Sequence, residues 1–190
     1  MERGHSEPFR DLKGKGLTFR ESWGDTMPHH VKPVPDGYHT ATAALTVHDA
    51  QRALEFYAKA FGAKERMRSD GPEGKIMHAE FEIGDSVIML SDEFPQMGSR
   101  SPKTLGGTVG GIWLYVPDTD ALYNRAIAAG ATSLMAPVDM FWGDRTSRVR
   151  DPFGHEWSIS THTEDVAPAE MQKRAKEFYA QAASRPARRP

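Results

Sequence analysis

The chain of 190 residues contains no cysteine, which excludes disulfide bonds, thiolate zinc sites and cysteine nucleophiles. It has no apolar run of the length that a membrane span needs, so we expect no membrane partner. The formal net charge is only −2, and without a long basic stretch we expect no nucleic-acid partner. The opening residues "MERGHSEPFRDLKGKG" lack the apolar core of a signal peptide. Together these absences predict a cytoplasmic protein.

What is present fits a globular domain: 38% of the residues are hydrophobic and 26% are charged. The length suffices for one domain with a sizeable core. We divide the chain into an N-terminal extension or arm (1–37), a central domain (38–162) and a C-terminal helix with a frayed tail (163–190). The extension has the charge, Gly and Pro of a flexible tail. An arm that wraps its own domain or a partner subunit is the alternative, because it also carries the apolar residues Phe9, Leu17, Phe19 and Trp23.

The central domain contains an internal repeat. "ALTVHDAQRALEFYAKAFGA" (44–63) resembles "WLYVPDTDALYNRAIAAGA" (113–131), and both contain Leu-x-Val-x-Asp and end in Gly-Ala. This order predicts a strand, an Asp N-cap, an amphipathic helix and a Gly at the C′ position. Three strand-like stretches follow each helix, and the alternation of apolar and polar residues around Gly84-Asp85 indicates a tight hairpin. Each half therefore reads as β-α-β-β-β.

The fold class that follows is α+β, with tandem βαβββ modules joined by a loop at about 93–108. The terminal stretch "APAEMQKRAKEFYAQA" adds a C-terminal helix with Pro168 in its first turn. Met171, Ala175 and Phe178 lie on one face of that helix.

Four stretches of the central domain carry a family resemblance: "YHTATAALTVHDAQRALEFYAKAFGA", "MHAEFEIGDSVIMLSDE", "LYVPDTDAL" and "GDRTSRVRDPFGHEWSISTH". They resemble the vicinal oxygen chelate superfamily of glyoxalases, extradiol dioxygenases and bleomycin-binding proteins, and are similar to its PhnB-like glyoxalase subgroup. The resemblance implies that the paired modules form a curled mixed sheet around a cleft. It also implies a homodimer and a small-molecule ligand held in that cleft.

The resemblance also permits a test for a metal. Metal-dependent members place one ligand on the first and last strand of each module, usually two His and two Glu. These positions carry over to Thr42, Met89, Gly111 and Ser158. A divalent site needs about three good donors, and these residues offer only two weakly ligating hydroxyls. We therefore predict no cofactor and no metal ligand at these positions. A divalent metal could bind only at a non-standard site.

The stretch "RVRDPFGHEWSIS" (148–160) shows which side chains face the cleft. Residues 151–154 read as a hairpin turn. If Ser158 faces the cleft, the two-residue strand period puts Glu156 on the same face and Trp157 against the helices. His155 then lies on the side of Trp157, so His155 and Glu156 cannot bind one cleft ion together.

The same period gives the rest of the cleft face. A two-residue turn at Gly84-Asp85 pairs Glu80 with Met89, and His78 shares their face. Ala79, Phe81 and Ile83 then face the core. The predicted cleft lining is Thr42, Ala44, His78, Glu80, Met89, Trp113, Tyr115, Glu156 and Ser158.

Trp113, Tyr115 and Met89 suit an apolar or planar ligand. Alternatively, Trp113 and Tyr115 simply fill the mouth of the cleft. His78, Glu80 and Glu156 are the candidate catalytic residues, since burial could raise a carboxylate pKa toward neutrality and allow acid–base catalysis. A simple solvent-edge pair is the alternative for His78 and Glu80.

The loop "DMFWGDR" (139–145) is a candidate lid. Phe141 or Trp142 would stack on the ligand, and Arg145 would pair with an anionic group. A bridge from Arg145 to Asp144 or Asp151 is the alternative.

Three functions remain open. The first is a metal-free small-molecule-binding protein of the sequestration or resistance type. The second is a glyoxalase-like lyase, isomerase or dioxygenase, working through metal-free acid–base chemistry or through a relocated metal on His78, Glu80 and Glu156. The third is an assembly or stress protein whose N-terminal arm and C-terminal helix bind partners.

Overall fold

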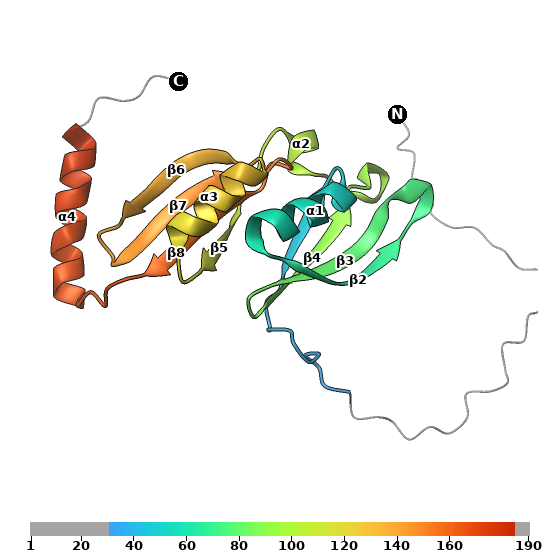
Figure 1. Ribbon diagram of the computed structural model, residues 1–190, viewed down its shortest axis with the longest axis horizontal. Coiled ribbons are helices and arrows are strands. Elements are labelled where there is room, and N and C mark those ends of the chain that lie inside the picture. The colour runs from blue at the N-terminus through green and yellow to red at the C-terminus, as the bar shows by residue number, and fades with distance from the viewer. Residues whose placement is uncertain (1–30, 185–190) are drawn as a thin grey trace, which may run out of the picture. The chain divides into compact units, whose positions relative to one another are not determined.

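The computed structural model of the chain describes residues 31–184 (Figure 1). The apolar residues of the predicted arm, Phe9, Leu17, Phe19 and Trp23, lie outside the described residues, so the arm stays a prediction. The elements below belong to the compact unit that begins at Val34.

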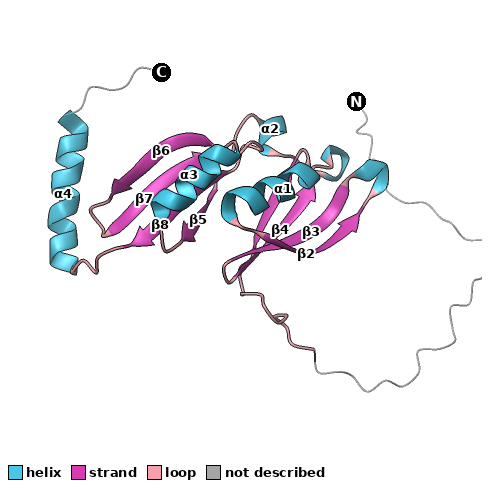
Figure 2. Ribbon diagram, in the orientation of Figure 1, coloured by secondary structure: helices cyan, strands magenta, loops and turns pink. Residues whose placement is uncertain are grey.

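Two βαβββ modules follow one another along the chain, as predicted (Figure 2). Module 1 consists of β1 (Ala43–Val47), α1 (Ala50–Phe61), β2 (Lys64–Asp70), β3 (Ile76–Ile83) and β4 (Ser86–Asp92). Module 2 consists of β5 (Gly111–Tyr115), α3 (Thr119–Ala129), β6 (Thr132–Asp139), β7 (Asp144–Arg150) and β8 (Glu156–His162). The remaining elements are the 3-10 turns η1 (Pro72–Gly74) and η2 (Pro95–Met97), the short helix α2 (Pro102–Leu105) and the C-terminal helix α4 (Pro168–Ser184).

Each module forms its own four-stranded mixed sheet, and the eight described strands do not close into a barrel. The strand order is β1-β4-β3-β2 in one sheet and β5-β8-β7-β6 in the other. In both sheets the first strand of the module runs parallel to the last, and the other neighbours are antiparallel. The identical order confirms the internal repeat and the α+β fold.

Matching caps begin and end the two module helices. The Asp49 carboxylate accepts a hydrogen bond from the Arg52 amide at 3.1 Å, and Asp118 accepts one from the Ala121 amide at 2.9 Å. The helices end at Gly62 and Gly130, whose φ values of 70° and 113° favour glycine. These are the N-cap and C′ positions that the repeat predicts.

The strand register agrees with the two-residue period. Glu80 lies opposite Met89 across β3 and β4, so the face predicted for the cleft is the one turned away from the helices. Ala79 and Phe81 are fully buried on the helix side. In module 2, Ser158 lies between Trp113 on β5 and Arg148 on β7.

The hydrophobic core is continuous between the modules, because α1 packs against α3. A buried carboxylate, Asp151, links them through hydrogen bonds of 2.9 Å from the Tyr57 hydroxyl of α1 and from the Trp157 indole. The amides of Phe153 and His155 also donate to Asp151, each at 2.9 Å. Burial raises the pKa of Tyr57 well above its usual value, with Asp151 adding to the shift. Residues 151–154 form the predicted hairpin turn, and Trp157 is core.

Within residues 31–184 no helix has both the length and the apolar character to span a membrane.

Candidate functional site

The face of the module 2 sheet that is turned away from the helices carries a hollow of about 500 Å³. We call it the module-2 hollow. Four of the predicted site residues line it together: Trp113, Trp142, Glu156 and Ser158. The other main side chains of its wall are Met135, Met140, Thr146 and Arg148. The sequence thus identifies part of the lining, although it misses Arg148 and the two Met residues.

Two arginines hold the carboxylate of this hollow. Arg148 and Arg150, both on β7, each donate to Glu156 at 2.7 Å, one to each carboxylate oxygen. The hydrogen bond from Arg150, supported by Arg148, holds the pKa of Glu156 below its usual value, although burial acts to raise it. Burial therefore does not bring the pKa of Glu156 toward neutrality, because the two arginines outweigh it. The alternation of Arg148 and Arg150 opposite Glu156 is a sequence signal that could have revealed the pair.

Asp144, at the start of β7, is a buried residue that the sequence analysis names only as a possible partner of Arg145. It is 3% exposed and accepts hydrogen bonds from the Tyr115 hydroxyl at 2.9 Å and the Trp142 indole at 3.0 Å. His162 Nδ1 lies 2.8 Å from its other oxygen. Burial acts to raise the pKa of Asp144, but these donors outweigh burial and hold the pKa below its usual value. One carboxylate therefore fixes two of the predicted ligand-binding aromatic residues.

His162 is the exposed member of this cluster. Its Nε2 lies 3.0 Å from Asp165, and hydrogen bonding to Asp144 and then to Asp165 raises the pKa of the imidazole. Hydrogen bonding to Asp144 raises the pKa of Tyr115 as well. The two-residue period extends from Ser158 through Ser160 to His162, so the strand pattern contains a signal for His162.

The face of the module 1 sheet carries a different cluster. Glu80, 6% exposed, lies 3.2 Å from His78 Nε2 and 3.8 Å from the Arg66 guanidinium. A hydrogen bond from the Tyr38 hydroxyl is the main cause that lowers the pKa of Glu80, and it outweighs burial. Burial does not raise the pKa of Glu80 toward neutrality either, because Tyr38, His78 and Arg66 stabilise the charged form. The pair of His78 with Glu80 is present, and Met89 is half-buried opposite Glu80.

The four positions that would hold a metal in related enzymes do not fit one. Thr42 precedes β1, and its hydroxyl donates to the His39 carbonyl at 3.4 Å. The residue opposite Met89 in the sheet is Ala44. A Cβ at Gly111 would come within 3.0 Å of the Glu156 carbonyl, which favours glycine there for packing. A thioether and a serine hydroxyl are poor partners for a divalent ion. In residues 31–184 no three His, Asp or Glu side chains gather as a metal site.

The candidate lid divides into residues with separate roles. Trp142 lines the module-2 hollow. Phe141 instead packs on α4, with its ring 5.3 Å from that of Phe178 and 6.0 Å from that of Tyr179.

Arg145 pairs with Asp120 and Asp139 rather than with Asp144 or Asp151. The reason is strand geometry: Arg145 lies one residue out of phase with Asp144, on the helix side of β7, and meets the first turn of α3.

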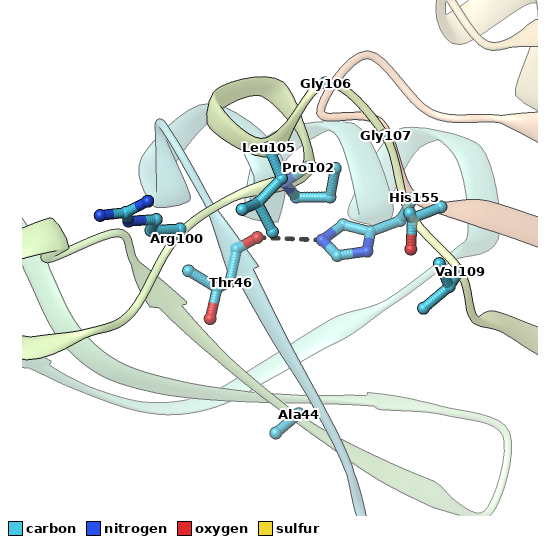
Figure 3. Close-up of a pocket in the computed structure, with 10 residues that line it drawn as sticks. Ala44, Thr46, Arg100, Pro102, Leu105, Gly106, Gly107, Val109 and His155 are labelled. Atoms are coloured by element: carbon cyan, nitrogen blue, oxygen red, sulfur yellow. Dashed lines mark hydrogen bonds between the residues drawn. The ribbon is translucent and has the colours of Figure 1, made fainter.

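A second hollow, of about 550 Å³, lies between β1 and the segment that joins the modules (Figure 3). Figure 3 shows Arg100, Leu105 and Val109 of that segment around it, with His155 Nε2 3.0 Å from the Thr46 carbonyl. A hollow of about 300 Å³ shares Thr108 and His155 with this one, and shares Thr108, Gly111 and Glu156 with the module-2 hollow. We call the three adjoining hollows the trough.

Comparison with known proteins identifies the family. Residues 38–159 match the family model described as the Glyoxalase/Bleomycin resistance protein/Dioxygenase superfamily. An uncharacterized protein of Mycobacterium tuberculosis (strain H37Rv) is 44% identical over 152 residues, covering 78% of this chain and 86% of the relative. An uncharacterized protein of Mycobacterium bovis is 47% identical over 131 residues, covering 67% and 86% respectively.

Solved structures agree on the fold. TioX from Micromonospora sp. ML1 is 26% identical, with a TM-score of 0.52, and the match covers 68% of this chain and all of TioX. Protein PA1353 from Pseudomonas aeruginosa is 25% identical, with a TM-score of 0.52, covering 65% of this chain and 98% of that protein. A PhnB protein from Bacillus cereus, 17% identical at a TM-score of 0.50 and covering 65% and 99% respectively, supports the fold alone.

Proposed function

The chain belongs to the glyoxalase/bleomycin resistance protein/dioxygenase superfamily, and from this premise we propose that it is a metal-free small-molecule-binding protein of the sequestration or resistance type. The proposed ligand is planar and occupies the module-2 hollow. The observation that carries the proposal is the combination of exposed aromatic side chains with carboxylates that are already neutralised by partners.

The aromatic residues supply a preformed surface. Trp113 is 48% exposed on the wall of a hollow of about 500 Å³, and a large exposed aromatic side chain at a concave site is typical of ligand binding. Trp142 is held by its hydrogen bond to Asp144. Because its ring is already ordered, binding costs less side-chain entropy there.

The carboxylates of the predicted cleft favour binding over acid–base catalysis. A general base works best with a pKa near the working pH, whereas the pKa values of Glu80 and Glu156 are lowered by hydrogen bonds from Tyr38 and from Arg150. A carboxylate in two ion pairs, as in Glu156, is a weak base.

A glyoxalase-like lyase, isomerase or dioxygenase is the second candidate, and one observation favours it. His162 is oriented by the buried Asp144, the arrangement by which proteins position a general base. If this candidate is correct, His162→Gln abolishes turnover of a bound compound while its dissociation constant stays the same.

A thermal-shift screen of planar aromatic compounds tests the proposal, followed by native mass spectrometry of the protein as purified. We expect Trp113→Ala to weaken binding of any hit by about tenfold or more. Tyr179→Ala, an exposed aromatic on α4, is the matched control and should leave binding unchanged. A screen without hits, or equal effects of the two variants, would contradict the proposal.

We also propose that the protein is a homodimer, belongs to the PhnB-like subgroup and is cytoplasmic. Met67, Trp113 and Tyr115 leave apolar surface on the two sheet faces, which a second copy could cover. Light scattering of the purified chain should give twice the mass of 21.1 kDa. A monomer at all concentrations would contradict the dimer.

A further inference from the structure

We propose that the ligand is an aromatic anion, whose ring stacks on Trp113 and whose negative group binds Arg148. This inference rests on the proposed function and specifies the class of ligand. It follows from a charge imbalance in the trough and from the spacing of residues across the module 2 sheet.

The imbalance begins around Glu156. Two guanidinium groups share this one carboxylate, so the cluster carries one net positive charge. The side chains of Arg148 and Arg150 are 49% and 50% exposed, and each uses one nitrogen on Glu156. Since a guanidinium has five N–H donors, both arginines keep donors for an anion.

The imbalance extends along the trough and into a hollow beside it. Arg100 lines the hollow of Figure 3, and Lys103 lines, with Arg150, a further hollow of about 530 Å³ beside it. Within residues 31–184 neither Arg100 nor Lys103 is paired with a carboxylate.

The acidic residues that line these hollows are Glu156 and Asp151, and the Asp151 carboxylate already accepts four hydrogen bonds. Four cationic side chains thus meet two anionic ones, in a chain whose net charge is −2. A concave surface of this sign attracts anions.

The sheet sets the distance between the aromatic residue and the cation. Trp113, Ser158 and Arg148 lie in one row across β5, β8 and β7. Two strand spacings separate the outer residues by about 10 Å, which accommodates one aromatic ring with a charged substituent. The serine between them is small, so the floor of the hollow stays open. A carboxylate, or a phosphate ester, then has the geometry that a guanidinium binds with two hydrogen bonds.

The test uses three compounds with the same ring: naphthoate, the neutral naphthamide and naphthyl phosphate. Isothermal titration of the full chain should show that naphthoate binds at least about tenfold more tightly than naphthamide. High salt should reduce that ratio. Comparison with naphthyl phosphate decides which anionic group fits, and a preference for either anion supports the proposal.

Variants assign the effect to the arginine. Arg148→Gln should bring the ratio of naphthoate to naphthamide affinity close to one. Arg68→Gln, which removes an exposed module 1 arginine paired with Glu65, is the matched control and should leave the ratio unchanged. Glu156→Gln removes the competing carboxylate, so naphthoate should bind several-fold more tightly while naphthamide does not change. A merely structural role for Glu156 predicts the opposite sign.

The outcomes separate this inference from the proposed function. Equal affinity for naphthoate and naphthamide, with both lost in Trp113→Ala, overturns the anion but keeps the planar-ligand site. Absence of binding by all three compounds counts against both. A tenfold preference for naphthoate that survives Arg148→Gln also overturns the role of Arg148.

Discussion

The two modules share one topology but have different exposed faces. Both contain the same strand order, the same Asp N-cap and the same Gly at the helix C-terminus. On the face away from the helices, module 1 carries the charged cluster around Glu80, whereas module 2 carries the exposed Trp113 and Tyr115, with Trp113 on the wall of the module-2 hollow. Position by position, Ala44 and Met89 in module 1 correspond to Trp113 and Ser158 in module 2.

This difference shows which constraints the repeat imposes. Side chains toward the helices form a shared core, so both modules keep apolar residues there. The opposite face does not enter that core, and its residues can differ without loss of the fold. This difference is the reason we propose ligand binding on the module whose exposed face is aromatic and hollowed.

The largest effect is expected at the hairpin turns. Asp151→Ala in module 2 removes the acceptor of three buried hydrogen bonds and one part-buried hydrogen bond, so the free energy of unfolding should fall by about 3 kcal/mol or more. Asp85→Ala in the corresponding turn of module 1 is the control, because Asp85 is exposed and accepts a hydrogen bond from Ser86. Urea unfolding measures both. Losses of similar size would contradict the unequal roles of the two turns.

The next effect concerns the two aromatic residues that donate to Asp144. Asp144→Asn puts an amide where a carboxylate accepts from Tyr115, Trp142 and His162, so it should cost about 2 kcal/mol of stability. Because Trp142 is then less ordered, binding of a planar ligand should weaken several-fold. Tyr115→Phe removes one donor and should cost about 1 kcal/mol. If Asp144→Asn binds the ligand as the native chain does, Asp144 does not position the site.

A smaller effect is the acid dependence of stability that Glu80 contributes on the module 1 face. The pKa of Glu80 is lowered in the fold, so its contribution is present above its unfolded value of about 4.3 and is lost as the pH falls through the folded value. Glu80→Gln should cost about 1 kcal/mol at neutral pH and remove this part of the acid dependence. Unfolding curves between neutral and acid pH measure it. If the unfolding free energy of Glu80→Gln and of the native chain falls equally as the pH is lowered, the proposed contribution of Glu80 is ruled out.

The smallest effect belongs to His162. Its pKa is raised by Asp144 and Asp165, so its stabilising contribution is complete below the unfolded value of about 6.5 and is lost as the pH rises through the folded value. The melting temperature of the native chain should therefore fall slightly as the pH rises from about 6.5 through the folded pKa of His162. In His162→Gln this fall should be smaller. The effect stays small because Asp165 is exposed. NMR titration of the His162 imidazole protons measures the pKa directly. A pKa that is not raised would contradict the predicted stabilisation by Asp144 and Asp165.

The sequence predicts most of the fold because its signals are local. The Leu-x-Val-x-Asp repeat, the caps and the turns at Gly84-Asp85 and 151–154 each depend on a few neighbouring residues. The strand period then places Glu80 with Met89, and Ser158 opposite to Trp157, on the correct faces.

The site is predicted less completely, because its partners come from distant segments. The pKa of Glu156 depends on two arginines of the neighbouring strand, and Arg145 pairs with Asp120 of α3 and Asp139 rather than with Asp144 or Asp151. The loop sequence predicts Phe141 as a lid residue, but its ring packs on Phe178 of α4, which the local sequence does not reveal. Asp144 collects donors from β5, β8 and the 139–145 loop, and no local pattern marks a buried carboxylate of that kind.

The most direct test of ligand binding by module 2 is NMR chemical-shift mapping of the full chain during titration with a planar aromatic compound. We expect the indole signals of Trp113 and Trp142 and the amides of Arg148 and Ser158 to shift together and to saturate. Shifts centred instead on His78, Glu80 and Met89 would place the ligand on module 1 and contradict the assignment.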